Sequence, residues 1–132
     1  MHLIYRITAL SRAAAALDAE RLEECSVRDG IHRAAAALIP LGMRFRILLA
    51  EGADMDPEFI AARDRTLKPL ALLVARGITQ GVLDPSADPV WVSMVLAGLL
   101  TAAVRASAAG VGEPDEAADR VTQALFDGFG HR

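Results

Sequence analysis

Apolar residues recur at intervals of three and four along nearly the whole chain, the spacing that places them on one face of an α-helix. The first stretch shows this clearly, with Leu3, Ile7, Leu10, Ala14 and Leu17 on one face. Ala and Leu are abundant, whereas β-branched and aromatic residues form few clusters, so no segment is typical of a β-strand. The pattern therefore predicts an all-α protein.

Capping residues and prolines divide the pattern into segments. Ser26 is placed to cap a second helix, and Pro40 is expected to end it, because proline removes a backbone hydrogen bond. A short third helix is then expected over residues 41–51, and a last one from the acidic start at residues 113–116. Connections are short and composition is even along the chain. We therefore predict a single helical bundle domain of about six helices, residues 1–132.

Two Asp-Pro pairs are the strongest start signals. In Asp56-Pro57 and Asp88-Pro89 the carboxylate can accept free amides of the first turn, and proline at the first helical position gives up no hydrogen bond. Pro69 falls inside the long pattern that follows the first pair, where proline costs about 3 kcal/mol unless the helix bends. A kink is therefore expected near residues 66–70.

The segment over residues 89–104 is apolar on every side, which a domain this small can hardly cover alone. The last helix has small residues along one flank, which lets two helices approach closely. These features predict a homodimer joined by an intersubunit four-helix bundle of the last two helices of each chain. The interface residues that we predict are Leu96, Leu100, Ala103, Val121, Ala124, Leu125 and Gly128.

Composition narrows the cellular setting. The chain has 132 residues and a formal net charge of -3, so it lacks the basic field that holds a nucleic-acid backbone. Its lone Cys25 cannot form an intrachain disulfide, and its start lacks the layout of a signal peptide. The uncharged stretch from Pro89 to Val104 is shorter than the roughly 20 residues that span a bilayer. We expect a cytoplasmic protein that binds neither membrane nor DNA directly.

Residues 44–129 carry an ordered series of short motifs, each weak alone. These are Arg46-Ile47-Leu48-Leu49, Asp56-Pro57-Glu58, Gly81-Val82-Leu83, Asp88-Pro89, Leu96-Ala97-Gly98-Leu99 and Leu125-Phe126-Asp127-Gly128-Phe129. In this order and spacing the chain resembles the C-terminal ligand-binding and dimerisation domain of TetR (tetracycline-repressor) family transcriptional regulators. The resemblance implies that residues 1–40 are linker-type helices and that residues 41–132 form the C-terminal region proper.

The same resemblance implies a function and a site. Family members bind a small, mostly apolar or amphipathic effector in a cavity among the central helices, and they bind DNA through an N-terminal helix-turn-helix. No such segment precedes Arg44, and whether this reflects the choice of segment, the gene start or evolution is left open. The expected ligand-binding residues are Met43, Phe45, Phe59, Arg63, Leu67, Leu70, Trp91 and Met94.

Alternatives stay open for each of these residues. Apolar side chains at helical spacing more often fill a core than bind a ligand. Arg63 could pair with an acidic ligand group, but solvation or a pair with Asp64 or Glu58 is the more ordinary role. The kink at Pro69 adds a hint of a pocket, because a bent helix leaves space.

No set of residues predicts catalysis, a metal site or a cofactor. His2, His32 and His131 are dispersed, with no ligand spacing to Cys25 or to carboxylates. There is no glycine-rich phosphate loop and no serine nucleophile motif. We therefore expect a ligand-sensing domain rather than an enzyme. The alternative is a helical adaptor that pairs with another protein and binds no small molecule.

Overall fold

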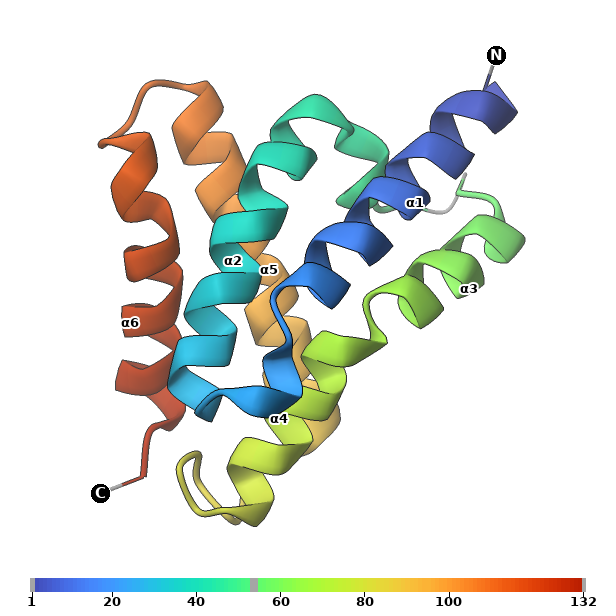
Figure 1. Ribbon diagram of the computed structural model, residues 1–132. Helices are drawn as coiled ribbons and strands as arrows, with labels where there is room; N and C mark the ends of the chain where they lie inside the picture. The colour runs from blue at the N-terminus through green and yellow to red at the C-terminus, as the bar shows by residue number, and fades with distance from the viewer. Residues whose placement is uncertain (1, 53–54, 132) are drawn as a thin grey trace.

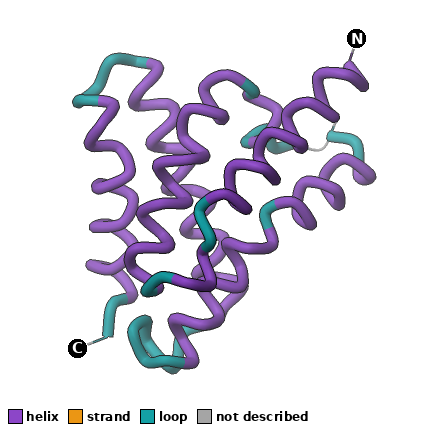
Figure 2. Tube along the Cα trace, viewed as in Figure 1, coloured by secondary structure: helices purple, strands orange, loops and turns teal. Residues whose placement is uncertain are grey.

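The structure, a computed structural model, describes residues 2–52 and 55–131, and it is all-helical. Its α-helices are α1 (His2–Ala19), α2 (Val27–Arg44), α3 (Pro57–Thr66), α4 (Lys68–Thr79), α5 (Pro89–Ala108) and α6 (Ala117–Phe129). Three single turns of 3-10 helix join them: η1 (Leu22–Glu24), η2 (Arg46–Leu48) and η3 (Pro114–Glu116). Figure 2 shows how short the connections are. The predicted fold class is confirmed.

The helix starts predicted at Ser26, Asp56 and Asp88 are confirmed by their caps. The Ser26 hydroxyl accepts a hydrogen bond from the amide of Asp29 at 3.1 Å, so α2 begins where expected. The carboxylates of Asp56 and Asp88 accept amides of the first turns of α3 and α5, at 3.0 and 2.9 Å. In both helices proline occupies the first turn, where its missing N–H leaves no gap.

Pro40 does not end the second helix, and that prediction is wrong. The helix runs through Pro40 to Arg44, and the expected third helix over residues 41–51 is replaced by this extension and by η2. Leu38 and Ile39 are buried on the inner side, while the proline itself is exposed. Burial of two such side chains contributes about 1.5–3 kcal/mol each, which offsets the roughly 3 kcal/mol that an internal proline costs.

The expected bend near Pro69 is confirmed, and it is sharp enough to divide the long helix in two. Leu67 leaves helical geometry with φ −91° and ψ 5°, and it separates α3 from α4. Pro69 therefore sits in the first turn of α4, where a missing amide is tolerated.

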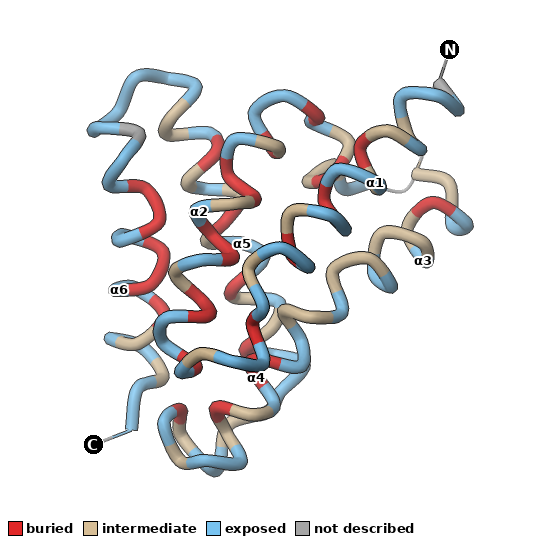
Figure 3. The backbone as a smooth tube through the Cα atoms, in the orientation of Figure 1, coloured by how far each residue is buried: buried red, intermediate tan, exposed pale blue. Residues whose placement is uncertain are grey.

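Helix α2 is the central element of the bundle. It packs against α6 on one side, α1 and α4 on the other, and α5 behind it in the view of Figure 1. Figure 3 shows the buried positions of α2 and α6 along their facing sides. The largest fully buried side chains lie along these contacts: Val27, Ile31, Val74, Leu83, Val92, Leu96 and Leu125.

Helices α1 and α3 form an arm beside this core. The guanidinium of Arg6 in α1 binds the Asp56 carboxylate at 3.1 Å and lies 5.3 Å from the centre of the Phe59 ring in α3. The rings of Tyr5 and Phe45 meet at a centroid distance of 5.7 Å. These contacts hold the N-terminal half of α1 against η2 and α3.

Helix α5 is, by length and composition, apolar enough to cross a membrane. Of its most apolar 18-residue stretch, 22% is buried inside the protein. One such helix is weak evidence, because core helices of soluble proteins pass the same test. Here its inner side packs against α2, α4 and α6, which is compatible with a soluble bundle.

Candidate ligand-binding cavity

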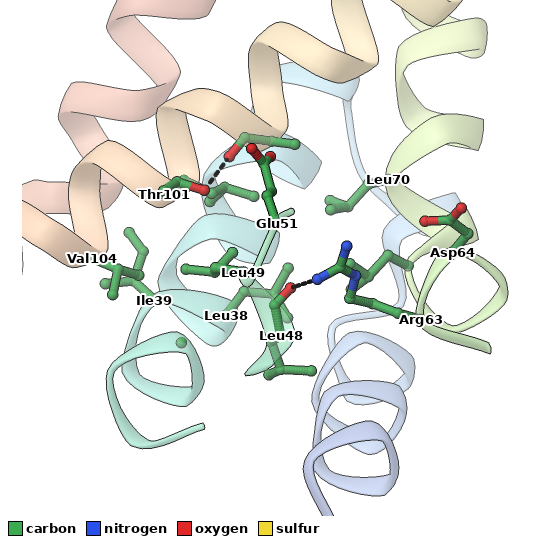
Figure 4. Close-up of a pocket in the computed structure, with 14 residues that line it drawn as sticks. Leu38, Ile39, Leu48, Leu49, Glu51, Arg63, Asp64, Leu70, Thr101 and Val104 are labelled. Carbon is green, nitrogen blue, oxygen red and sulfur yellow. Dashed lines mark hydrogen bonds between the residues drawn. The ribbon is translucent and has the colours of Figure 1, made fainter. Parts of the chain in front are cut away.

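A cavity of about 140 Å³ lies where the C-terminal halves of α2 and α5 meet η2 and the junction of α3 with α4. Its walls are mainly apolar, and Figure 4 shows the side chains pointing toward a common space. The lining residues are Leu38, Ile39, Gly42, Leu48, Leu49, Glu51, Arg63, Asp64, Leu67, Leu70, Ala97, Leu100, Thr101 and Val104.

The local sequence explains why space remains here. The break at Leu67 turns α3 away from the line of α4, so the two helices do not close together over η2. Gly42 lets α2 come close to its neighbours, since a methyl group added there would lie 2.8 Å from Val104 Cγ2 and 3.0 Å from Leu49 Cδ1. Both neighbouring side chains border the cavity, so any side chain at position 42 would push them into it.

Arg63 is the half-buried charged residue of the cavity wall. Its Nη1 donates to three backbone carbonyl oxygens, of Ile47 at 3.2 Å, Leu48 at 3.3 Å and Ala50 at 2.6 Å. In the described ranges it forms no ion pair, so of the two ordinary roles expected for it, solvation or a pair with Asp64 or Glu58, the pair is not formed. Helical spacing could not reveal this role, because the partners are carbonyl groups of a distant turn.

The other polar groups of the lining are more accessible. Glu51 and Asp64 are both exposed, so water can solvate their carboxylates. The hydroxyl of Thr101 donates to the carbonyl of Ala97 at 3.0 Å, within its own helix. The cavity thus combines apolar walls with one positively charged group that is partly withdrawn from water.

The expected ligand-binding residues divide into three groups. Arg63, Leu67 and Leu70 line the cavity. Phe45 and Phe59 are each only 5% exposed and are core residues that do not line it. The remaining three lie outside it: Met43 borders a neighbouring open groove, and Trp91 and Met94 are 58% and 62% exposed on the outer side of α5.

Sequence reasoning missed the α2 and α5 walls. The available signal was that Leu38, Ile39, Leu100 and Val104 fall on the inner sides of two long helices. Helical periodicity assigns such residues to a core, and it carries no information about where a core is incompletely filled.

The expected interface residues also divide. Leu96, Leu100, Val121 and Leu125 are buried inside their own chain, at 5% exposure or less, and Ala103 is half-buried. Ala124 and Gly128 of α6 are exposed. Between Val90 and Val104 the exposed apolar residues of α5 are Val90, Trp91, Met94, Ala97, Gly98 and Ala102, of which Ala97 also borders the cavity.

Other polar side chains form isolated contacts. Nε2 of His32 lies 2.7 Å from the Asp119 carboxylate and links α2 to α6 at the surface. The Asp84 carboxylate accepts the backbone amide and the hydroxyl of Ser86, and these bonds lower its pKa below the usual 3.8. Within residues 2–52 and 55–131, no group of three or more His, Cys, Asp or Glu side chains is placed to hold a metal ion. The side chain of His2 lies outside the description.

The fold has a counterpart among solved structures. A structure described as a protein with unknown function from Rhodococcus sp. RHA1 matches this chain with a TM-score of 0.77 and 18% sequence identity. The match covers 97% of this chain and 71% of that one. No protein-family model and no curated protein matches the chain. At this identity the similarity shows that the two proteins share the helical fold.

Proposed function

We propose that this chain is a ligand-sensing and dimerisation domain of a TetR-like transcriptional regulator, and that it binds a small, mostly apolar effector. The observation that carries the proposal is the cavity between α2, η2, α4 and α5. Protein cores pack at the density of organic crystals and contain few voids larger than a water molecule. An apolar space of about 140 Å³ in a 132-residue domain is therefore suited to a ligand.

The outer side of α5 supports pairing with a second copy. No charged residue interrupts α5 between Pro89 and Val104, and Trp91 and Met94 are largely exposed. Toward α6 this surface continues through Ala102 into a groove that Ala103 and Ala124 also line. An apolar helix face of this length is costly to leave in water. In a twofold dimer the same face of both chains is buried in one interface, so neither chain leaves it exposed.

The link to transcription rests on the resemblance of residues 44–129 to TetR-family domains. In that family the DNA-binding segment precedes the effector domain. The similar Rhodococcus structure is longer than the shared fold, because the match covers 71% of it. Under this proposal the chain senses and pairs, and any contact with DNA belongs to a separate helix-turn-helix.

A cavity-filling variant tests ligand binding. Leu70→Phe places a ring in the cavity, whereas Leu72→Phe adds the same ring at a 58% exposed position of the same helix. Small aromatic compounds are expected to raise the melting temperature of the wild type and of the Leu72 variant in a saturable way. They should have no effect on the Leu70 variant. Binding that survives Leu70→Phe would place the ligand elsewhere, and a panel that never stabilises the wild type would refute ligand sensing in this cavity.

The alternative is an adaptor domain that uses the outer side of α5 to bind a different protein. The exposed Trp91 is the observation that favours it, since tryptophan is enriched at the centres of protein interfaces. The two functions differ in the behaviour of the purified chain. Sedimentation equilibrium at micromolar concentration should show a dimer for the sensing domain, whereas an adaptor would stay monomeric and bind no small apolar compound.

A further inference from the structure

We propose that the ligand of the cavity is a small carboxylate whose apolar body is about the size of one six-membered ring, and that Arg63 holds its carboxylate group. This inference rests on the proposed function, because it names the chemical class of the effector. It combines the volume of the cavity with the state of the Arg63 guanidinium.

The volume limits the apolar body. An apolar cavity of about 150 Å³ is sufficient to hold benzene, and the cavity here measures about 140 Å³. Leu38, Leu70 and Val104 supply apolar walls from three helices. A single ring or a branched chain of about six carbons therefore matches this volume, and a pair of fused rings would extend beyond it.

Arg63 is prepared to bind an anion. Three carbonyl oxygens hold its Nη1, so the side chain is already ordered and little conformational entropy is lost when a ligand binds. Carbonyl groups are neutral, so the positive charge of the guanidinium is not cancelled by them. In Figure 4 the other terminal nitrogen points away from Leu48 and toward Leu70, on the cavity side. A carboxylate there would form a charge-assisted hydrogen bond away from bulk water.

The two acidic residues of the lining raise the competing possibility of a cationic ligand. Glu51 and Asp64 could attract a cationic ligand, but both are exposed, and exposed charges interact weakly because water screens them. Arg63 is the half-buried charge, so its preference dominates. Ligands of one size and different charge therefore distinguish the two possibilities.

The experiment is a charge series on one ring, followed by isothermal titration calorimetry at pH 7 and low salt. Benzoate, benzyl alcohol and benzylamine are compared on the wild-type chain. Benzoate is expected to bind about tenfold or more tightly than benzyl alcohol, the usual gain of a hydrogen bond between charged groups, and benzylamine least tightly. 1-Naphthoate, the size control, is expected to bind less tightly than benzoate.

Substitutions then assign the preference to Arg63. Arg63→Gln keeps an amide donor on a shorter side chain but removes the charge. It should weaken benzoate about tenfold or more and leave benzyl alcohol within about twofold. Unchanged binding of benzyl alcohol shows that the variant is folded around the cavity. Glu51→Gln, which removes an exposed negative charge, should strengthen benzoate a few-fold.

Every outcome of these measurements supports or overturns the carboxylate inference. Equal binding of benzoate and benzyl alcohol, abolished by Leu70→Phe, overturns the carboxylate inference and leaves ligand sensing in place. Tightest binding of benzylamine also overturns it and assigns the polar group to the acids. If no member of the series binds at all, the proposed function fails together with the inference. If Arg63→Gln does not fold, the wild-type series and Glu51→Gln still decide the sign of the preferred charge.

Discussion

Gly98 offers a direct test of the outer side of α5. It lies in the middle of that exposed face, and a methyl group added to it would meet no atom within 4 Å. Within a single chain, replacing it should therefore only improve helix propensity, by about 0.8–1 kcal/mol for alanine and nearly as much for arginine. In a domain of this length such a gain corresponds to roughly 3–4 °C in melting temperature.

Pairing should respond in the opposite direction. In a twofold dimer across this face, Gly98→Arg buries one unpaired charge from each chain, at a cost of several kcal/mol. The dissociation constant of the dimer should then rise by about 100-fold or more, whereas the single chain becomes slightly more stable. Gly98→Ala supplies the helix gain without the charge, and Ala71→Arg places the same charge on an exposed position of α4.

Sedimentation equilibrium measures the association of these variants, and urea unfolding at low protein concentration measures the stability of the single chain. Dimerisation of the Gly98→Arg chain with wild-type affinity would show that the outer side of α5 is not the contact. A loss of single-chain stability in Gly98→Ala would show that the space around Gly98 is filled, contrary to the structure.

Three further predictions concern stability and ionisation. Gly77→Ala should destabilise the chain by about 1–2 kcal/mol in urea unfolding, because the new methyl group would lie 2.9 Å from Cδ1 of the fully buried Leu83. Asp88→Ala should cost about 1 kcal/mol in the same assay, since it removes the cap of α5. For Asp84 the pKa is lowered first by the backbone amide and then by the hydroxyl of Ser86. Its contribution to stability is therefore present above pH 3.8 and lost as the pH falls through the folded-state pKa. An NMR titration of Ser86→Ala should show this pKa rising part of the way toward 3.8, and an unchanged pKa would contradict the assigned cause.

The predictions from sequence succeeded where the information is local. An Asp-Pro pair determines a helix start within one turn, because cap and proline act on amides only two or three residues away. Asp56 and Asp88 therefore marked the starts of α3 and α5 correctly. The division at Leu67 followed from the steric effect of Pro69 on the turn before it, which is equally local.

Pro40 shows where local rules give way to packing. Its ring faces outward, while residues on both sides of it in the chain pack against the rest of the bundle. The gain from that burial depends on helices that are distant in sequence. The same limit applies to Arg63, whose partners are carbonyl oxygens of residues 47–50. No local sequence pattern predicts the packing around Pro40 or the hydrogen bonds of Arg63.

Helix α5 shows a second limit of sequence-based prediction, because its two sides do not differ in polarity. Because both of its sides are apolar, periodicity cannot tell which side faces the core. Trp91 and Met94 were expected inside and are exposed, whereas Leu96 and Leu100 were expected between subunits and are buried in their own chain. Contacts with α2, α4 and α6 determine which side of α5 is buried, and the sequence of α5 alone does not contain them.

The position of α5 joins the two proposals physically. Leu100 and Val104 line the cavity on its inner side, and Met94 and Gly98 lie on its outer side, so ligand and partner would contact opposite faces of one helix. A helix is a stiff rod about 10 Å across, and a displacement imposed on one face is transmitted to the other. A ligand that shifts α5 therefore changes the dimer dissociation constant, and dimerisation must change the ligand affinity by the same factor.

Measuring benzoate affinity at protein concentrations below and above the dimer dissociation constant gives one side of this cycle, and measuring dimerisation with and without benzoate gives the other. Equal factors different from one would establish that the cavity and the pairing face are coupled, as a shift of α5 requires, and factors of one would show that they act independently.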